Sequence, residues 1–245
     1  ARTYDGGSGF GGAVFSDGAD TLILGSIFTE NRAGRYGGAV YFTYNKSSTD
    51  KETTLSGCTF QRNEADGGGG AAYVRSLLKP LTIDDCTFAG NRATDAGAGG
   101  GAVTTQTQHT NVYGSSFVQN ASDGEGPALL ALSGVLTLDA DTFDQNTRGG
   151  SYEYGEDVAL SYGYGVTSLA LRVEGSPYGG SMDIGECTEL FVGSDSADAP
   201  FVIETDGETL AVENGGRMRM VTGGYTGGFS AESSGKAYLT LREYR

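Results

Sequence analysis

The chain has 245 residues, 42 of them glycine, with 16 basic and 31 acidic side chains and a formal net charge of -15. Nucleic acid is excluded as a partner, because a phosphate-binding surface needs clustered Lys and Arg, and the basic residues here are scattered. The glycines follow no Gly-X-Y period, which excludes collagen, and no apolar run is long enough for a membrane-spanning helix. The chain begins at Ala1 without an initiator Met or an apolar leader, so we expect a processed mature protein or part of a larger one.

Two short motifs alternate from residue 11 to residue 160. The first is Gly-Gly-Ala-Val or a variant, and its copies begin at Gly11, Gly37, Gly69 and Gly100, with decayed copies at Gly126 and Asp157. The second is Phe-x-x-Asn, and its copies are Phe28 with Asn31, Phe60 with Asn63, Phe88 with Asn91, Phe117 with Asn120 and Phe143 with Asn146. The alanines of the first motif follow one another after 26, 32, 31, 26 and 31 residues. Periods of this size are typical of solenoids, propellers and arrays.

The residues before each Phe indicate how the chain bends. Aliphatic residues stand five positions before it and small or turn-forming residues three positions before it; these are Ile23, Leu55, Ile83, Val112 and Leu138, and Gly25, Gly57, Asp85, Gly114 and Ala140. Five positions would place the aliphatic side chain opposite to Phe in an unbroken strand, so the small residue must bend the chain and restore the inward direction. Each repeat therefore predicts a strand, a bend, a second strand, a turn at Asn and a third strand at Gly-Gly-Ala-Val.

Such a unit predicts an all-β, single-domain, right-handed parallel β-helix of about 26 to 32 residues per coil. Helical solenoids are excluded, because the repeat has no apolar stripe at helical spacing. The Phe and aliphatic columns are expected to fill the interior, each side chain on its copy in the next coil. The Asn residues are interpreted as a structural ladder, because their amides can donate and accept along the axis and they tolerate a left-handed backbone.

Cysteines at equivalent positions occur in two consecutive coils. Cys58 and Cys86 both stand two residues before Phe, so their α-carbons are expected within disulfide range. A disulfide and a pair of buried thiols both remain open. Together with Cys187 they show no metal-ligand spacing, so we expect no metal site and no cofactor.

The repeat signature fades after residue 165, but strand-like alternation continues, for example at Leu169, Leu171 and Val173. Glycine pairs such as Gly179-Gly180 separate these short segments, as is typical of strands and turns. We therefore divide the chain into a repeat β-helix at 1–165 and continuing degenerate coils or a β cap at 166–245. A cap is expected because the open end of a solenoid would otherwise offer unpaired strand edges.

The alternating motifs, beginning with Gly11 to Val14 and with Phe28 and Asn31, resemble the polymorphic outer membrane protein repeat over about 150 residues. That family is best known in bacterial autotransported adhesins that carry the repeat on a β-helical passenger domain. The resemblance implies surface display and attachment to a cell or matrix, with the repeats acting as scaffold. It therefore predicts an extracellular or cell-surface location.

Few residues suggest catalysis. His109 is the single histidine and stands in a polar connector without an activating Ser or Cys motif, so we interpret it as a solvated loop residue. Asp84, Asp85, Asp139 and Asp141 include candidates for glycosidase carboxylates, but the alignment places Asp84, Asp85 and Asp139 at bends, where acidic residues are common. Pectin lyases and polygalacturonases share the fold, yet their calcium-carboxylate clusters and Gly-His-Gly motif are missing from the sequence. We expect no catalytic residues.

The leading hypothesis is a non-catalytic binding or adhesion module whose partner is a host or neighbouring-cell surface, a glycan or a matrix component. Candidate contact regions are the insertions at 43–52, 93–99 and 148–156, because loops on a rigid scaffold commonly carry function. Tyrosines near the last insertion are the candidate binding residues, since they give contact area at low entropic cost: Tyr152, Tyr154, Tyr162 and Tyr164. The alternatives are a polysaccharide lyase or hydrolase and a structural element of a wall or filament.

Overall fold

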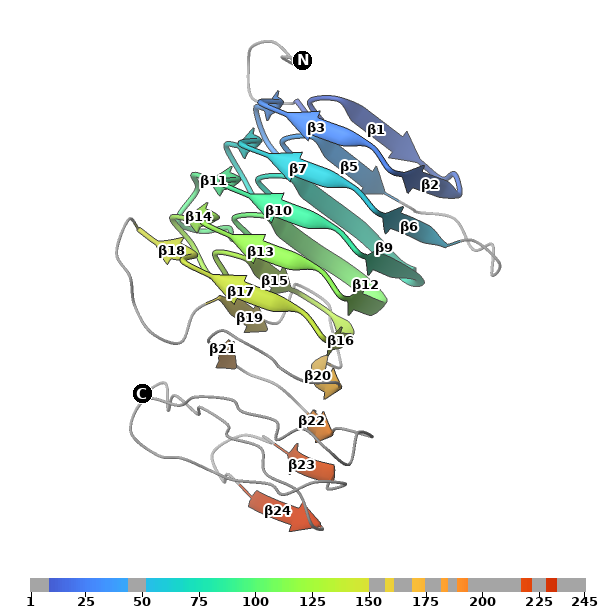
Figure 1. Cartoon of the computed structure of the whole chain (residues 1–245), viewed down its shortest axis with the longest axis vertical. Helices are drawn as coiled ribbons and strands as arrows, with labels where there is room; N and C mark the ends of the chain where they lie inside the picture. Colours follow the sequence, from blue (N-terminus) through green and yellow to red (C-terminus); the bar gives the residue numbers. More distant parts are fainter. Residues whose placement is uncertain are drawn as a thin grey trace.

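The computed structural model describes residues 9–43, 52–149 (without the side chains of 77–79) and 157–160, and the backbone of five later strands. In this part of the chain there is no helix, and parallel strands stack into a solenoid (Figure 1). The predicted all-β parallel β-helix is confirmed. Among the described residues, no helix has the length and hydropathy that a membrane crossing would need.

The described residues form three sheets, and the first contains the Phe residues of the repeat. Its strands pair in parallel in the order β17-β13-β10-β7-β3, and each Phe is in register with the Phe of the next coil. The strands are β3 (Ile27–Thr29), β7 (Thr59–Gln61), β10 (Thr87–Ala89), β13 (Ser116–Val118) and β17 (Thr142–Asp144).

The second sheet consists of two-residue strands that directly follow the Asn of each repeat, and it pairs in the order β18-β14-β11-β8-β4. Its strands are β4 (Arg32–Ala33), β8 (Glu64–Ala65), β11 (Arg92–Ala93), β14 (Ala121–Ser122) and β18 (Thr147–Arg148). The alignment did not predict this sheet, because two residues are too few to show an alternating pattern.

The third sheet is the longest and differs from the predicted arrangement. The Gly-Gly-Ala-Val strand and the aliphatic strand were expected as separate strands of the coil, but both belong to this sheet and merge into single strands in β9 and β12. Its members are β1 (Val14–Asp17), β2 (Thr21–Leu24), β5 (Val40–Thr43), β6 (Thr53–Ser56), β9 (Ala72–Asp84), β12 (Val103–Tyr113), β15 (Leu129–Ala131), β16 (Gly134–Asp139), β19 (Val158–Leu160), β20 (Leu169–Glu174), β21 (Met182–Ile184), β22 (Glu189–Gly193), β23 (Arg217–Val221) and β24 (Gly228–Glu232).

Beyond residue 165 the long sheet continues before its pairing changes. Strand β20 pairs in parallel with β16 and β22, whereas β23 pairs antiparallel with both β22 and β24. The last two described strands therefore leave the solenoid pattern, and they lie at the lower end of the molecule in Figure 1.

Left-handed backbone occurs at two corners around the Phe strand, and also at the first residue of five copies of the Gly-Gly-Ala-Val motif: Gly11, Gly37, Gly69, Gly100 and Gly126. The small residue three positions before Phe has φ between 48° and 59° in all five coils, which confirms the predicted bend; these residues are Gly25, Gly57, Asp85, Gly114 and Ala140. At the second corner the left-handed residue is the one before Asn: Glu30, Arg62, Gly90, Gln119 and Gln145. The stretch from the first corner to the end of the short strand after Asn has a constant length of nine residues, at 25–33, 57–65, 85–93, 114–122 and 140–148.

The second corner corrects one prediction about the Asn residues. We expected the Asn itself to adopt the left-handed backbone, and this is wrong for all five: Asn31, Asn63, Asn91, Asn120 and Asn146. In the first coil the left-handed residue is Glu30, with φ of 54°, and not Asn31. The reason is that the backbone N–H and the side-chain amide of Asn31 both bond the same oxygen of Asn63. These two hydrogen bonds hold Asn31 in line with the next coil, so the turn falls one residue earlier.

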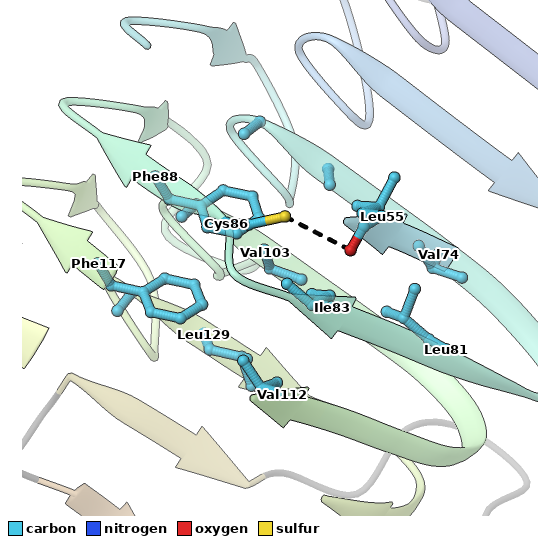
Figure 2. Close-up of a cluster of buried hydrophobic side chains, with 14 of the residues drawn as sticks. Leu55, Val74, Leu81, Ile83, Cys86, Phe88, Val103, Val112, Phe117 and Leu129 are labelled. Atoms are coloured by element: carbon cyan, nitrogen blue, oxygen red, sulfur yellow. Dashed lines mark hydrogen bonds between the residues drawn. The ribbon is translucent and has the colours of Figure 1, made fainter. Parts of the chain in front are cut away.

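The interior is filled by columns of identical or similar side chains. The five Phe rings stack with centroids 4.8 to 4.9 Å apart and planes within 8° of parallel, which matches the spacing of neighbouring strands. Figure 2 shows two of these rings, Phe88 and Phe117, facing the aliphatic side chains of Ile83 and Val112. The rings are completely buried except at the two ends of the column, which are Phe28 and Phe143.

The Asn residues form a ladder along one corner, from Asn31 to Asn146. The Nδ2 amide of each donates to Oδ1 of the next at 2.9 to 3.0 Å, and the same oxygen accepts the backbone N–H of the donor residue. From the second coil onward, Nδ2 also donates to the carbonyl of the Phe in the preceding coil, for example from Asn91 to Phe60 at 3.0 Å. At the C-terminal end, Asn146 donates to a carboxylate oxygen of Asp157 at 2.7 Å. The buried amides are thereby satisfied within the described ladder.

Candidate functional site

The predicted contact residues fall largely outside the described part of the chain. Tyr152, Tyr154, Tyr162 and Tyr164 all lie there, as do most of the insertions at 43–52 and 148–156. The insertion at 93–99 is described and forms a compact turn, in which the N–H of Gly97 donates to the Asp95 carboxylate at 2.9 Å.

The residues interpreted as structural parts of the repeat lie in two columns, one of Phe and one of Asn. Asn31 begins the Asn column, where it is buried and donates to Asn63 at 2.9 Å. Phe28 begins the Phe column and stacks on Phe60. Neither column presents its polar atoms to the solvent, so a contact surface must be sought on the outer faces of the coils.

The candidate catalytic residues have separate positions and local partners. His109 is exposed on strand β12 next to a register shift, and not in a loop as predicted, because the long strand extends through the polar connector. Asp84 accepts a hydrogen bond from the Ser56 hydroxyl at 3.0 Å, and Asp85 occupies a left-handed bend. Among the described residues no group of three or more His, Cys, Asp and Glu side chains is arranged to hold a metal.

Asp141 is the one buried carboxyl group of these candidates. Its two oxygens accept the backbone N–H groups of Ser115 at 2.8 Å and Asp139 at 3.0 Å. Burial raises the pKa of Asp141 to about 7, against the lowering effect of these two hydrogen bonds. It occupies the inward column of Ser26, Cys58, Cys86 and Ser115, so its position serves the bend of the coil.

The two cysteines of this column are buried free thiols, which resolves the alternatives left open by the sequence. The Cys86 Sγ atom accepts the backbone N–H of Cys58 at 3.4 Å and lies 3.4 Å from the carbonyl oxygen of Leu55 (Figure 2). Burial raises the pKa of the Cys86 thiol to about 12, so it is protonated and unreactive at neutral pH.

Five aromatic side chains that the sequence analysis did not select gather on the outer face of the first three coils. We call them the aromatic patch: Phe10, Phe15, Tyr36, Tyr41 and Tyr73. Three come from equivalent positions of β1, β5 and β9, where the preceding Val14, Val40 and Ala72 point inward. Because side chains alternate along a strand, the aromatic residue that follows must point outward.

The rings of the patch contact one another. Phe15 stacks on Tyr41 with centroids 5.6 Å apart and planes at 8°, and Tyr41 stacks on Tyr73 at 5.5 Å and 22°. Phe10 lies against Tyr41 at 4.7 Å, Phe15 at 6.4 Å and Tyr36 at 5.9 Å. Phe15 is 54% exposed, whereas Tyr41 and Tyr73 are mostly covered by their neighbours. The patch therefore presents the flat apolar ring of Phe15 to the solvent, and the rings of Phe10 and Tyr41 hold it in place.

Glycines make room for these rings. A Cβ atom on Gly67 would lie 2.7 Å from the Tyr36 ring, and one on Gly68 would contact the ring of Tyr73. The next outward residues of the same column are Thr104 and Leu130, so the patch ends with the third coil. The sequence contains a signal for this column, because an aromatic residue directly follows each of the first three Gly-Gly-Ala-Val copies. This column was not identified from the sequence, because only the residues expected to point inward were considered.

Two arginines accompany the patch. The guanidinium carbon of Arg35 lies 5.2 Å from the Tyr36 ring centroid and 5.7 Å from that of Phe10. Arg75 lies two coils from Asp17 in the same outward column. Both arginines act electrostatically on Tyr41 and Tyr73, where burial is the larger effect and raises the pKa of Tyr73 to about 12. The tyrosines are therefore neutral at physiological pH, and the arginines supply the charge of the surface.

Other exposed arginines are neutralised by carboxylates. Arg32 bonds Glu64 and Asp66, Arg62 bonds Glu30, and Arg92 bonds Asp123, with N···O distances of 2.9 to 3.2 Å. In the part of the chain that the structure describes, Arg35 and Arg75 make no ion pair. The aromatic patch with Arg35 and Arg75 is thus a local cationic and aromatic surface on a strongly acidic protein.

The fold and its repeats define the chain as a β-helical repeat protein, and comparisons with known proteins give the type of repeat. Residues 25–43 and 57–75 match the family model of the Chlamydia polymorphic membrane protein (Chlamydia_PMP) repeat. Each matched segment runs from a left-handed bend through Phe-x-x-Asn to the Gly-Gly-Ala strand. The chain therefore resembles the polymorphic membrane protein repeat family, as predicted.

Two curated proteins show wider similarity. The chain is 28% identical over 250 residues to the "Probable autotransporter YfaL" of Escherichia coli (strain K12), an alignment that covers 94% of this chain and 18% of that protein. It is 30% identical over 142 residues to the "Probable outer membrane protein pmp20" of Chlamydia pneumoniae, covering 54% of this chain and 8% of that protein. The chain thus spans less than a fifth of either relative. No solved structure matches it significantly.

An autotransporter and an outer membrane protein are both proteins of the bacterial surface. These relatives support the predicted extracellular or cell-surface location, and with the fold they indicate a surface-exposed β-helical protein.

Proposed function

We propose that the chain is a non-catalytic binding and adhesion module, whose repeats form a rigid scaffold and whose partner belongs to a host or neighbouring-cell surface or to a matrix. The observation that carries the proposal is the aromatic patch, with its exposed Phe15 and with Arg35, which has no ion-pair partner among the described residues. Exposed aromatic residues and arginines are the side chains that most often dominate binding surfaces. Phe15 is fixed on strand β1, and the rings of Phe10 and Tyr36 restrict Arg35, so little ordering is required on binding.

The positions of the acidic residues support a non-catalytic function. A glycoside hydrolase needs two carboxyl groups facing one bond, about 5 to 9.5 Å apart. Asp141 instead holds two backbone N–H groups in the interior, and Asp85 shapes a bend. The polysaccharide-active enzyme remains the alternative that the experiment must address.

A capture experiment tests the proposal. The full chain would be immobilised and exposed to arrays of glycans and matrix proteins and to intact cells, and bound material would be quantified. Phe15→Ser combined with Tyr36→Ser is expected to reduce capture at least tenfold. Tyr113→Ser is the matched control, because Tyr113 is also an exposed aromatic residue but lies away from the patch at the end of β12.

Two results would contradict the proposal. One is equal capture by the patch variant and the wild type. The other is cleavage of pectin or another polysaccharide, measured as new reducing ends, that disappears in Asp84→Asn, Asp85→Asn or Asp139→Asn. The second result would establish the enzyme in place of the binding module.

A further inference from the structure

The Arg35 guanidinium is held in place by rings instead of by a carboxylate of the described residues. Its contacts with the rings of Phe10 and Tyr36 restrict it, while its backbone N–H is bonded to the carbonyl of Gly9 at 2.9 Å. A guanidinium stacked on aromatic faces keeps its N–H edge free for other partners. That edge is suited to bidentate hydrogen bonds with a planar carboxylate or with two oxygens of a sulfate.

The lack of an ion pair distinguishes Arg35 from three other exposed arginines of the described residues. Arg32, Arg62 and Arg92 are exposed like Arg35, and each has carboxylate partners within 3.2 Å. With 31 acidic residues, the chain has ample carboxylates with which to pair Arg35, yet in its described part none does so. An anionic partner of Arg35 is therefore expected from beyond the described residues, and a bound ligand can supply it.

Phe15 adds an apolar requirement to the charge. Its ring is 54% exposed and is fixed by parallel stacking on Tyr41, and Phe10 lies between it and Arg35. A partner that uses both features must carry an anionic group on the edge of a flat body with an apolar face. A pyranose ring with a carboxylate or sulfate substituent has this form, because its axial C–H bonds present an apolar face. The side chains of Asp and Glu offer the charge without such a face.

We propose that Phe15 and Arg35 form a binding site for an acidic saccharide, with the sugar ring on Phe15 and its anionic group on the Arg35 guanidinium. The inference rests on the proposed binding function and adds the class of ligand. Carboxylated and sulfated sugars share the required chemistry, and the experiment distinguishes them.

Isothermal titration calorimetry on the full chain tests the site with defined probes. These are hexagalacturonate for the carboxylate, fully sulfated maltohexaose for the sulfate, neutral maltohexaose as the uncharged reference, and hexaglutamate as an acidic peptide. At least one acidic saccharide is expected to bind at least tenfold more tightly than both maltohexaose and hexaglutamate, and the preference between the two acidic saccharides identifies the anionic group.

Variants place the interaction on the named residues. Arg35→Gln is expected to weaken binding of the acidic saccharide at least tenfold, which is about the effect of losing a charge-assisted hydrogen-bond pair. Arg35→Lys keeps the charge but loses the planar edge and is expected to bind with intermediate affinity. Arg62→Gln is the control, because it removes an exposed arginine with an internal partner and is expected to leave binding unchanged. Circular dichroism spectra that match the wild type show that Arg35→Gln is folded.

Several outcomes would overturn the inference: wild-type affinity in Arg35→Gln, equal binding of neutral maltohexaose, tighter binding of hexaglutamate, or no binding of either acidic saccharide. If the arrays still show capture that depends on Phe15 and Tyr36 but not on acidic sugars, the proposed function stands and only the ligand class is wrong. If the wild-type chain shows neither capture on the arrays nor binding of a saccharide, both proposals are overturned.

Discussion

The Oδ1 atom of Asn120 accepts two hydrogen bonds from Asn91, one from its backbone N–H and one from its side-chain amide, each 3.0 Å long. A single oxygen therefore fixes both the backbone and the side chain of the neighbouring coil. Asn91 is fully buried, so water cannot replace these bonds if they are lost.

Replacing Asn91 by Ala is expected to lower the free energy of unfolding by about 2 to 4 kcal/mol, because it leaves the Asn63 N–H and the Phe60 carbonyl without their bonds in the interior. Urea unfolding followed by circular dichroism measures the effect. Asn111→Ala is the control, since Asn111 lies on the outward side of β12, and a loss within about 0.5 kcal/mol is expected there. Equal losses would show that the ladder does not stabilise the fold.

Phe88→Ala is expected to cost about 3 to 5 kcal/mol, because it removes a completely buried ring from the middle of the stack. Thr87→Ala, one residue away on the exposed side of β10, is expected to change stability by no more than about 0.5 kcal/mol. Comparison of the two denaturation midpoints tests the contrast, and a small effect at Phe88 would contradict the interior column.

Ala140→Gly is expected to stabilise the protein by about 0.5 to 1 kcal/mol. Ala140 has φ of 56°, which costs a residue with a Cβ about 1 to 2 kcal/mol, and glycine avoids this cost at some loss of chain entropy. Three other coils already have glycine at this bend. The control is Ala121→Gly in strand β14, where the same change is expected to destabilise by about 0.5 to 1 kcal/mol. Thermal unfolding of both variants gives the sign, and a loss of stability at Ala140 would contradict the prediction.

The carboxyl group of Asp141 predicts a pH dependence. Its pKa is raised from 3.8 to about 7 by burial, so between these values the folded state binds more protons than the unfolded state. The contribution to stability is fully present below about pH 4 and is lost as pH rises through about 7. Asp141→Ser copies the residue found in this column at Ser26 and Ser115 and is expected to lose less stability than the wild type between pH 4 and pH 8.

The unfolding free energies of the wild type and of Asp141→Ser are measured across this range. Their difference at each pH removes the repulsion due to the general negative charge, which both proteins share. Identical pH profiles would mean that folding does not shift the pKa of Asp141. A wild-type profile that rises more steeply with pH would mean that its pKa is lowered.

The coil and its interior could be predicted from the sequence, because identical residues that recur once per repeat identify the side chains at equivalent positions of successive coils. Phe88 and Asn91 were placed correctly for this reason. The left-handed residue of the second corner was not predicted, because Glu is not a residue type that favours a positive φ. The conformation of Glu30 follows from the hydrogen bonds that fix Asn31, the next residue. The merging of strands in the long sheet could not be predicted either, because the length of each strand depends on the strands that pair with it in the neighbouring coils.

The candidate site was harder to predict than the fold. Tyr41 and Tyr73 lie next to the inward residues of the motif and repeat at the same positions, so their column was visible in the alignment. Their proximity to Arg35 was not, because Arg35 follows β4 at the start of a connecting loop and lies at the patch through its own contacts with the rings of Phe10 and Tyr36.

The constant nine-residue stretch between the bend and the short strand restricts where this protein can change in evolution. All differences in coil length occur outside it, so gene insertions can enlarge the connections of the long sheet without disturbing the stacked rings or the amide ladder. A deletion of one residue inside 85–93 would instead break the alignment of Phe88 and Asn91 with both neighbouring coils. Recombination between two copies of the stretch would add or remove a whole coil, and would change the length of the molecule by one strand spacing, about 4.8 Å.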